Sequence, residues 1–177
     1  MKQGQNKKSP ARSVALVGIM AAAAECVKLA LAAIPNVEAV TLLLALFGYS
    51  FGWLGVASAF VFVMIEPLIW GVNTWVISYF LYWPFVAFVF MLLRKRGIKS
   101  RWLLTLAAVA LTFWFGVLTS LVDVGLFSGS FDNFFFRFGV YYARGIVFYA
   151  AQILCNAVLF PLLFGFLADK LIRIRKN

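Results

Sequence analysis

The chain has 177 residues, of which 64% are hydrophobic and 12% are charged, and its net charge is +10. A soluble domain of this size could not bury so much apolar surface, so the composition excludes a water-soluble protein and predicts an integral membrane protein. The basic residues flank apolar segments and do not alternate with aromatic residues, which argues against a nucleic-acid partner and favours contact with anionic lipid headgroups.

Thirteen of the sixteen Lys and Arg residues form three clusters, within residues 2–12, 94–101 and 170–176. Short loops rich in Lys and Arg are retained in the cytoplasm. We therefore expect all three clusters to be cytoplasmic, with both termini inside the cell and an even number of crossings between clusters. The expected location is the cell (plasma) membrane.

The first apolar segment covers residues 13–34 and follows a basic tail at residues 1–12. This arrangement is also typical of a signal peptide. However, the segment is long enough to cross the membrane and contains Glu25 and Lys28, so we interpret it as a retained helix. Because these two residues are three positions apart, they are expected to pair within the helix.

Small residues follow the same helix, including Ala15, Gly18 and Ala22. Gly18 and Ala22 have the small-xxx-small spacing that lets a second helix approach closely. This surface could face a neighbouring helix of the same chain or another subunit.

Residues 35–39 form the first expected external connection. Pro35 ends the preceding helix, and either Asn36 or Glu38 is suited to begin the next one. Both side chains are candidates for ligand contact, and the alternative is that they only cap a helix.

Residues 40–69 must return the chain to the outside if the next helix is to run inward. Gly48, Gly52, Trp53 and Gly55 lie in the middle of this stretch. We therefore predict two short helices broken near these residues.

The second expected external connection, residues 67–74, is rich in polar and aromatic side chains. Glu66, Trp70, Asn73 and Trp75 fall within or beside it, and together they suit a lid over a ligand. For Trp75 and Trp83 the alternative is an interfacial aromatic belt that binds nothing.

The next predicted helices cover residues 75–93 and 102–122. The first carries Tyr79, Tyr82 and Trp83, of which at least two rings can face the inside of a bundle. A long external connection, residues 123–137, follows the second helix and begins with Asp123.

The last predicted helix covers residues 138–167, and four polar residues recur along one side of it: Tyr141, Arg144, Gln152 and Asn156. An arginine within a span is costly. Arg144 is therefore expected to extend toward the membrane surface or to meet a ligand or a carboxylate, such as Glu66 or Asp123.

Several kinds of chemistry have no candidate residues in this chain. It contains no histidine, no metal-ligand spacing, no nucleophile beside a base and no phosphate-binding glycine loop. We therefore predict that it is not an enzyme and binds neither a metal nor a cofactor. Cys26 and Cys155 lie within predicted spans and are expected to be reduced.

The predicted fold is an all-α integral membrane protein with six transmembrane helices and both ends inside. The membrane domain covers residues 13–172, between the basic tail and a basic C-terminus at residues 173–177. This pattern, together with the Ala-rich first helix, the Ile-Pro-Asn-Val-Glu turn at 34–38 and the 66–75 connection, resembles the substrate-binding S components of energy-coupling factor (ECF) vitamin transporters.

The resemblance implies partners as well as a fold. S components dock through an AxxxA motif on the first helix onto a transmembrane coupling subunit, which two ATPase subunits drive with ATP. Here Ala15, Gly18 and Ala22 occupy the matching region, with Gly18 in place of the first alanine.

The resemblance also implies an external cavity that binds a vitamin. The Pro-Asn-Val-Glu sequence resembles S components assigned to cobalamin, which is the first expectation, and pyridoxine, a hydroxymethylpyrimidine or a similar small heterocycle is the alternative. The many aromatic residues and few buried charges favour a mostly neutral organic ligand. The expected binding residues are Asn36, Glu38, Glu66, Trp70, Asn73, Trp75, Tyr79, Tyr82, Asp123, Tyr141, Arg144 and Gln152.

Two other functions are compatible with the same residues. A stand-alone secondary transporter would use Glu25 or Glu66 as its proton-coupling group. A structural or assembly protein would use the small-residue face and the aromatic loops for partner contacts only, and would bind no small ligand.

Overall fold

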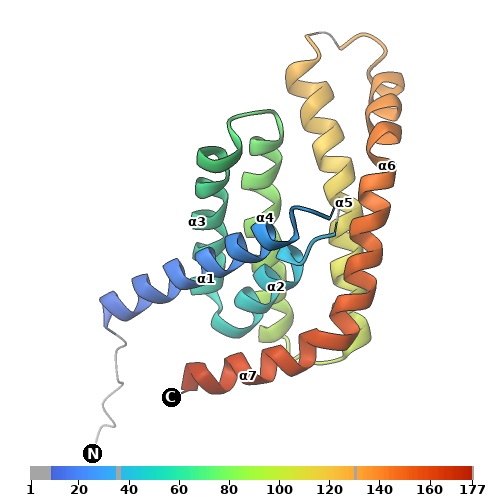
Figure 1. The fold of residues 1–177 in the computed structure, drawn as a ribbon. Helices are drawn as coiled ribbons and strands as arrows, with labels where there is room; N and C mark the ends of the chain where they lie inside the picture. Colours follow the sequence, from blue (N-terminus) through green and yellow to red (C-terminus); the bar gives the residue numbers. More distant parts are fainter. Residues whose placement is uncertain (1–8, 35–36, 130, 177) are drawn as a thin grey trace, which may run out of the picture.

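The computed structural model describes residues 9–34, 37–129 and 131–176. Every regular element within these ranges is helical, as the ribbon in Figure 1 shows. Five of these helices are long and apolar enough to cross a membrane. The predicted class, an all-α membrane protein with several crossings, is therefore confirmed at this level.

Helix α1 (Pro10–Leu31) begins three residues before its predicted start. The side chain of Ser9 accepts a hydrogen bond from the backbone N–H of Arg12 at 3.3 Å, and Pro10 occupies the first turn. Both features favour a helix N-terminus at this point. The helix runs obliquely across α2 (Val40–Phe51) and α3 (Trp53–Trp70) in Figure 1, so that only one side of it is buried.

Helices α2 (Val40–Phe51) and α3 (Trp53–Trp70) confirm the predicted break, which lies at Gly52. Gly52 has a φ of 66°, a backbone conformation that glycine adopts without strain. Helix α2 is buried on nearly all sides, as expected of a helix that is apolar all around. Its 12 residues give a length of roughly 18 Å, against about 30 Å for a bilayer core.

Helix α2 is therefore too short to cross the membrane alone, and six crossings stay a prediction. It lies in the centre of the bundle between α1, α3 and α4 (Trp75–Lys95). Its packing against α4 is the most extensive contact between helices in the described chain. The contact between α4 and α5 (Arg101–Phe127) is rich in aromatic side chains, and the ring centroids of Tyr82 and Phe115 lie 4.6 Å apart.

Helices α5 (Arg101–Phe127) and α6 (Phe134–Leu159) form a pair that extends beyond α3 and α4 (Figure 1). Helix α5 ends five residues later than predicted and α6 begins four residues earlier, so the connection expected at residues 123–137 was too long. Asp123 lies within α5. Arg137 lies within α6, where it donates a hydrogen bond to the backbone carbonyl of Ser128 at 3.2 Å.

The prediction of a single helix over residues 138–167 was wrong for its C-terminal part. After Leu159 the chain forms a π-helical turn, η1 (Phe160–Phe164), and then a separate helix, α7 (Gly165–Lys176), which crosses the end of the bundle in Figure 1. Pro161 has no N–H to continue the α-helical bonding pattern, which explains the change in pitch and direction. Residues 173–176 of the basic C-terminus are part of this helix.

Two contacts place the middle basic cluster and α7 at the same end of the bundle. Tyr49, near the end of α2, donates a hydrogen bond to the carbonyl of Ile98 at 2.8 Å. Arg175 of α7 donates one to the carbonyl of Ser50, also at 2.8 Å. Two of the three basic clusters thus lie together, and their cytoplasmic location stays a prediction.

Candidate functional site

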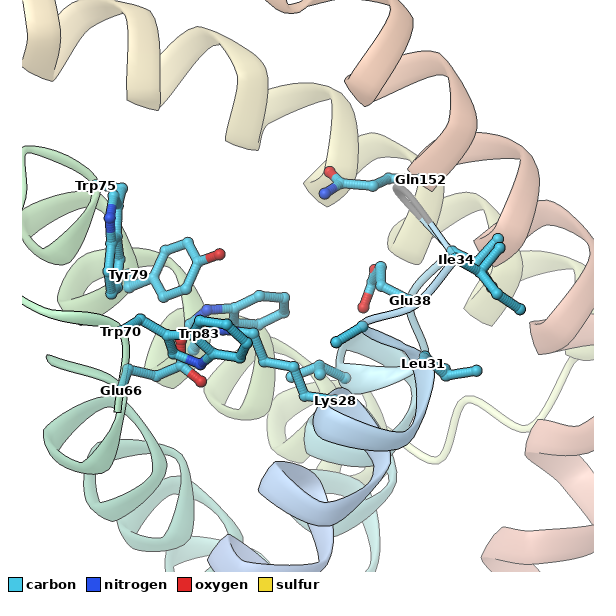
Figure 2. A pocket seen from close by; sticks show the side chains of 13 residues that line it. Lys28, Leu31, Ile34, Glu38, Glu66, Trp70, Trp75, Tyr79, Trp83 and Gln152 are labelled. Atoms are coloured by element: carbon cyan, nitrogen blue, oxygen red, sulfur yellow. Dashed lines mark hydrogen bonds and ion pairs between the residues drawn. The ribbon is translucent and has the colours of Figure 1, made fainter. Parts of the chain in front are cut away.

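A cavity of about 480 Å³ lies where α1, α2, α3 and α4 bring their ends together. It is at the N-terminal end of α4, whereas the middle basic cluster follows the C-terminal end of that helix. Figure 2 shows its side chains from close by. The lining residues are Lys28, Leu31, Ala32, Ile34, Val37, Glu38, Val40, Glu66, Trp70, Trp75, Tyr79, Trp83 and Gln152.

Aromatic rings form one side of the cavity. Trp75, Tyr79 and Trp83 are spaced four residues apart and therefore lie on one face of α4. Their ring centroids are 4.8 Å apart from Trp75 to Tyr79 and 5.6 Å apart from Tyr79 to Trp83. Trp70, at the end of α3, completes this side, and Glu38 and Gln152 lie across from it in Figure 2.

An ion pair joins α1 to α3 at the wall of the cavity. The Lys28 ammonium donates to the Glu66 carboxylate, and the Glu66 side chain is completely buried. The same ammonium lies 5.2 Å from the ring centroid of Tyr79, 5.4 Å from that of Trp70 and 6.0 Å from that of Trp75. Lys28 is thus held by a carboxylate and by aromatic faces together.

The predicted pair between Glu25 and Lys28 was wrong. Lys28 points to Glu66 on the neighbouring helix α3. The contact between α1 and α3 largely removes both side chains from water, and their ion pair offsets the cost of burying each charge. Glu25 is also buried and lies next to Glu66. Neither of its carboxylate oxygens has a hydrogen-bond partner among the residues that the structure describes.

Glu38 both caps a helix and faces the cavity. Its carboxylate accepts hydrogen bonds from the backbone N–H of Thr41 at 3.0 Å and from the Thr41 hydroxyl at 2.6 Å. It also accepts one from the Asn156 amide of α6 at 3.1 Å, and the same amide reaches the Thr112 hydroxyl of α5 at 3.0 Å. The capping role expected for Glu38 is confirmed, and the same carboxylate fixes α5 and α6 beside the cavity.

Of the twelve residues predicted to bind substrate, six line the cavity: Glu38, Glu66, Trp70, Trp75, Tyr79 and Gln152. Asn36 lies outside the described residues. Asn73 lies in the turn before α4, where its side chain accepts a hydrogen bond from the N–H of Thr74 at 2.6 Å. Tyr82 is buried against Trp83 and Phe115 and is not among the residues that line the cavity.

Three of the predicted residues lie on the α5–α6 pair, away from the cavity. Tyr141 and Arg144 are exposed in the N-terminal half of α6, where the described chain places only α5 beside them. The Arg144 guanidinium lies 5.9 Å from the Tyr141 ring centroid. Glu66 is paired with Lys28, and Asp123 is half-buried in α5, so neither carboxylate is joined to Arg144 by an ion pair in the described chain.

Sequence reasoning missed Lys28 and Trp83 as cavity residues. Trp83 follows Tyr79 by four residues, and that spacing was a usable signal. Lys28 had been assigned to a partner on its own helix, although any intramembrane charge is a candidate for a contact between helices. The aliphatic lining residues, such as Leu31 and Val37, carry no signal in the sequence that separates them from lipid-facing residues.

The expected docking residues are available on the surface of this chain. Ala15, Gly18 and Ala22 are exposed on α1, on the side away from α2 and α3. A Cβ atom at Gly18 would meet no other atom within 4 Å. Cys26 and Cys155 are both free, and no group of three or more metal-ligating side chains occurs among the residues that the structure describes.

Comparisons with protein families, with curated proteins and with solved structures found no match to this chain. The cavity has therefore to be interpreted from its own shape and chemistry.

Proposed function

We propose that this protein is the substrate-binding membrane subunit of an energy-coupling factor transporter, which captures a vitamin or vitamin precursor for uptake into the cell. The observation that carries the proposal is the cavity of about 480 Å³, with aromatic rings on one side and an ion pair in its wall. Cavities of roughly 300 to 1,000 Å³ with apolar walls and a few placed polar groups are typical of small-molecule sites.

The position of the cavity supports uptake from the outside. Trp75 lines it at the start of α4, and the basic cluster that begins at Arg94 lies at the other end of the same helix. The positive-inside rule assigns the basic end to the cytoplasm. The cavity then lies in the outer half of the membrane, with both termini of the chain in the cytoplasm.

The volume of the cavity favours one group of candidate ligands over another. A pyridine or pyrimidine with its substituents is the size of ligand that a cavity of about 480 Å³ encloses. A corrinoid is several times larger. We therefore place pyridoxine-like and hydroxymethylpyrimidine-like compounds ahead of cobalamin as the ligand.

The proposed transport step depends on partner subunits. The exposed small residues of α1, Ala15, Gly18 and Ala22, suit close packing against a helix of a coupling subunit within the membrane. This chain has no phosphate-binding glycine loop, so the two ATPase subunits of the transporter would supply the ATP hydrolysis.

A secondary transporter is the second candidate, and the buried carboxylates favour it. Glu25 and Glu66 lie next to each other and share one nearby lysine, Lys28. Acidic residues inside a membrane are typical of proton-coupled transporters. Such a protein would take up its ligand without ATPase partners, and collapse of the proton gradient would stop it.

Ligand identification and uptake measurements test these functions. Native mass spectrometry of protein purified in mild detergent from cells grown in rich medium is expected to reveal a bound heterocycle. Uptake of that compound should require the ATPase subunits and should persist when a protonophore is added at constant ATP. Uptake without the ATPases would favour the secondary transporter, and the absence of any ligand would favour an assembly role.

The Trp70→Ala variant is expected to weaken ligand binding by about 1 to 3 kcal/mol, because it removes a ring from the wall of the cavity. Isothermal titration with the co-purified ligand would measure the change. Arg144→Ala is the matched control, since Arg144 does not line the cavity, and its affinity should equal that of the unmodified protein. Equal affinity in both variants would place the ligand elsewhere.

The Gly18→Leu variant is expected to abolish uptake and to leave ligand binding unchanged, because the bulky side chain covers the exposed face of α1 and does not touch the cavity. Gly139→Leu is the control, since Gly139 is an exposed glycine of α6 with equally open surroundings. Normal uptake by Gly18→Leu would refute the docking role of this face.

A further inference from the structure

We propose that the cavity selects an organic cation, either a ring with a fixed positive charge or one protonated at neutral pH. The inference rests on the proposed function and narrows its substrate class. It differs from the mostly neutral ligand that the composition favours. Three observations carry it: the balance of charges in the cavity, the aromatic faces around Lys28, and buried polar atoms that lack partners.

The balance of charges around the cavity is negative. One lysine and two glutamates line it, Lys28, Glu38 and Glu66, and a further buried acidic side chain, Glu25, lies next to Glu66. The charge of Lys28 is already matched by Glu66. An anionic ligand would add a further negative charge to a desolvated site, which is unfavourable, whereas a cation would reduce the excess.

The aromatic wall already surrounds a cation. The ammonium of Lys28 lies within 6.0 Å of the ring centroids of Phe62, Trp70, Trp75 and Tyr79. Ring faces attract positive charge, and the attraction is stronger where the contact is desolvated. Three of these rings also line the cavity, so a ligand cation would meet the same faces and would compete with Lys28 for them.

Unpaired polar atoms indicate where hydrogen bonds to such a ligand could form. Glu66 lines the cavity and is completely buried, and its Oε1 has no partner in the described part of the chain. The indole N–H of Trp83, in a side chain that is 7% exposed, also lacks one there. Buried polar groups are normally satisfied. A cationic ring with a donor for Glu66 and an acceptor for Trp83 would satisfy both.

The test compares ring compounds of nearly the same size and different charge. Purified protein in lipid nanodiscs would be titrated with 1-methylnicotinamide, nicotinamide and nicotinate, and with a panel of water-soluble vitamins and their precursors sorted by charge at pH 7. We expect the cation of the matched series to bind at least tenfold more tightly than the neutral amide, and the anion to bind most weakly. The tightest compound of the panel should also be a cation.

The other outcomes separate the two proposals. If a neutral or anionic compound binds most tightly, the cation inference is refuted and the proposed function stands. If no compound of either set binds, both are refuted.

A charge-neutralising variant tests the inference at the level of the site. Glu38→Gln keeps an acceptor for Thr41 and removes one negative charge from the cavity. It is expected to reduce the affinity for 1-methylnicotinamide about five- to tenfold and to change that for nicotinamide less than twofold. Asp123→Asn, which neutralises a carboxylate away from the cavity, should change neither affinity. Equal losses for the two compounds in Glu38→Gln would contradict the electrostatic role.

Discussion

The Lys28→Met variant is expected to destabilise the protein by about 3 to 5 kcal/mol, because it leaves the carboxylate of Glu66 buried without its cation. Glu66 has no exposed surface, and its other acidic neighbour, Glu25, offers no replacement cation. Methionine preserves most of the length of the lysine stem, so the loss would arise from charge and not from packing. Thermal unfolding in mild detergent, followed by tryptophan fluorescence, would measure the effect as a lower midpoint.

A double-mutant cycle provides the control for this prediction. Glu66→Gln combined with Lys28→Met removes both charges, and the double variant should recover most of the stability that Lys28→Met loses. Lys170→Met, on the exposed side of α7, should have little effect on the midpoint. A Lys28→Met protein as stable as the parent would mean that the ion pair contributes nothing to holding α1 against α3.

The parts of the fold that the sequence predicts are those set by local chemistry. Gly52 permits the turn between α2 and α3. Ser9 and Pro10 are a local signal for the start of α1, but apolar length alone placed that start at residue 13. The bend after Leu159 has a local signal too, Pro161, but the hydropathy continues through it, so apolar length alone predicts one helix. Apolar length likewise did not distinguish the central helix α2 from a membrane span.

The candidate site was predictable where a single helix or turn determines it. Trp75 and Tyr79 share a face because of helical spacing, and Glu38 caps the helix that it precedes. The pairing of Lys28 with Glu66 joins residues 38 positions apart, and it depends on the angle at which α1 crosses α3. Arg144 was misplaced for the same reason, because no local signal shows that α5 and α6 extend beyond the rest of the bundle.

Because α2 and α4 are in close contact at Gly48, adding a single methyl group at this position is expected to reduce the stability of the protein strongly. A Cβ atom at Gly48 would lie 2.6 Å from the carbonyl carbon of Ala87 and 2.8 Å from its Cα atom, and closer still to the carbonyl oxygen. These are backbone atoms of α4, which cannot move aside as a side chain can. Gly48→Ala would therefore force the two helices apart.

We expect Gly48→Ala to destabilise the protein by about 3 kcal/mol or more, at the upper end of the cost of overpacking. The same separation would shift Val40 at the start of α2 away from Trp75 and Tyr79 on α4, and all three line the cavity, so ligand affinity should fall as well.

Gly18→Ala is the matched control: it makes the same substitution in α1 with no neighbour within 4 Å, and alanine favours a helix over glycine by up to about 1 kcal/mol. Its unfolding midpoint should stay level or rise. A Gly48→Ala protein that matches this control in both midpoint and affinity would show that α2 and α4 do not require the glycine for their contact, and that this contact does not hold the cavity in shape.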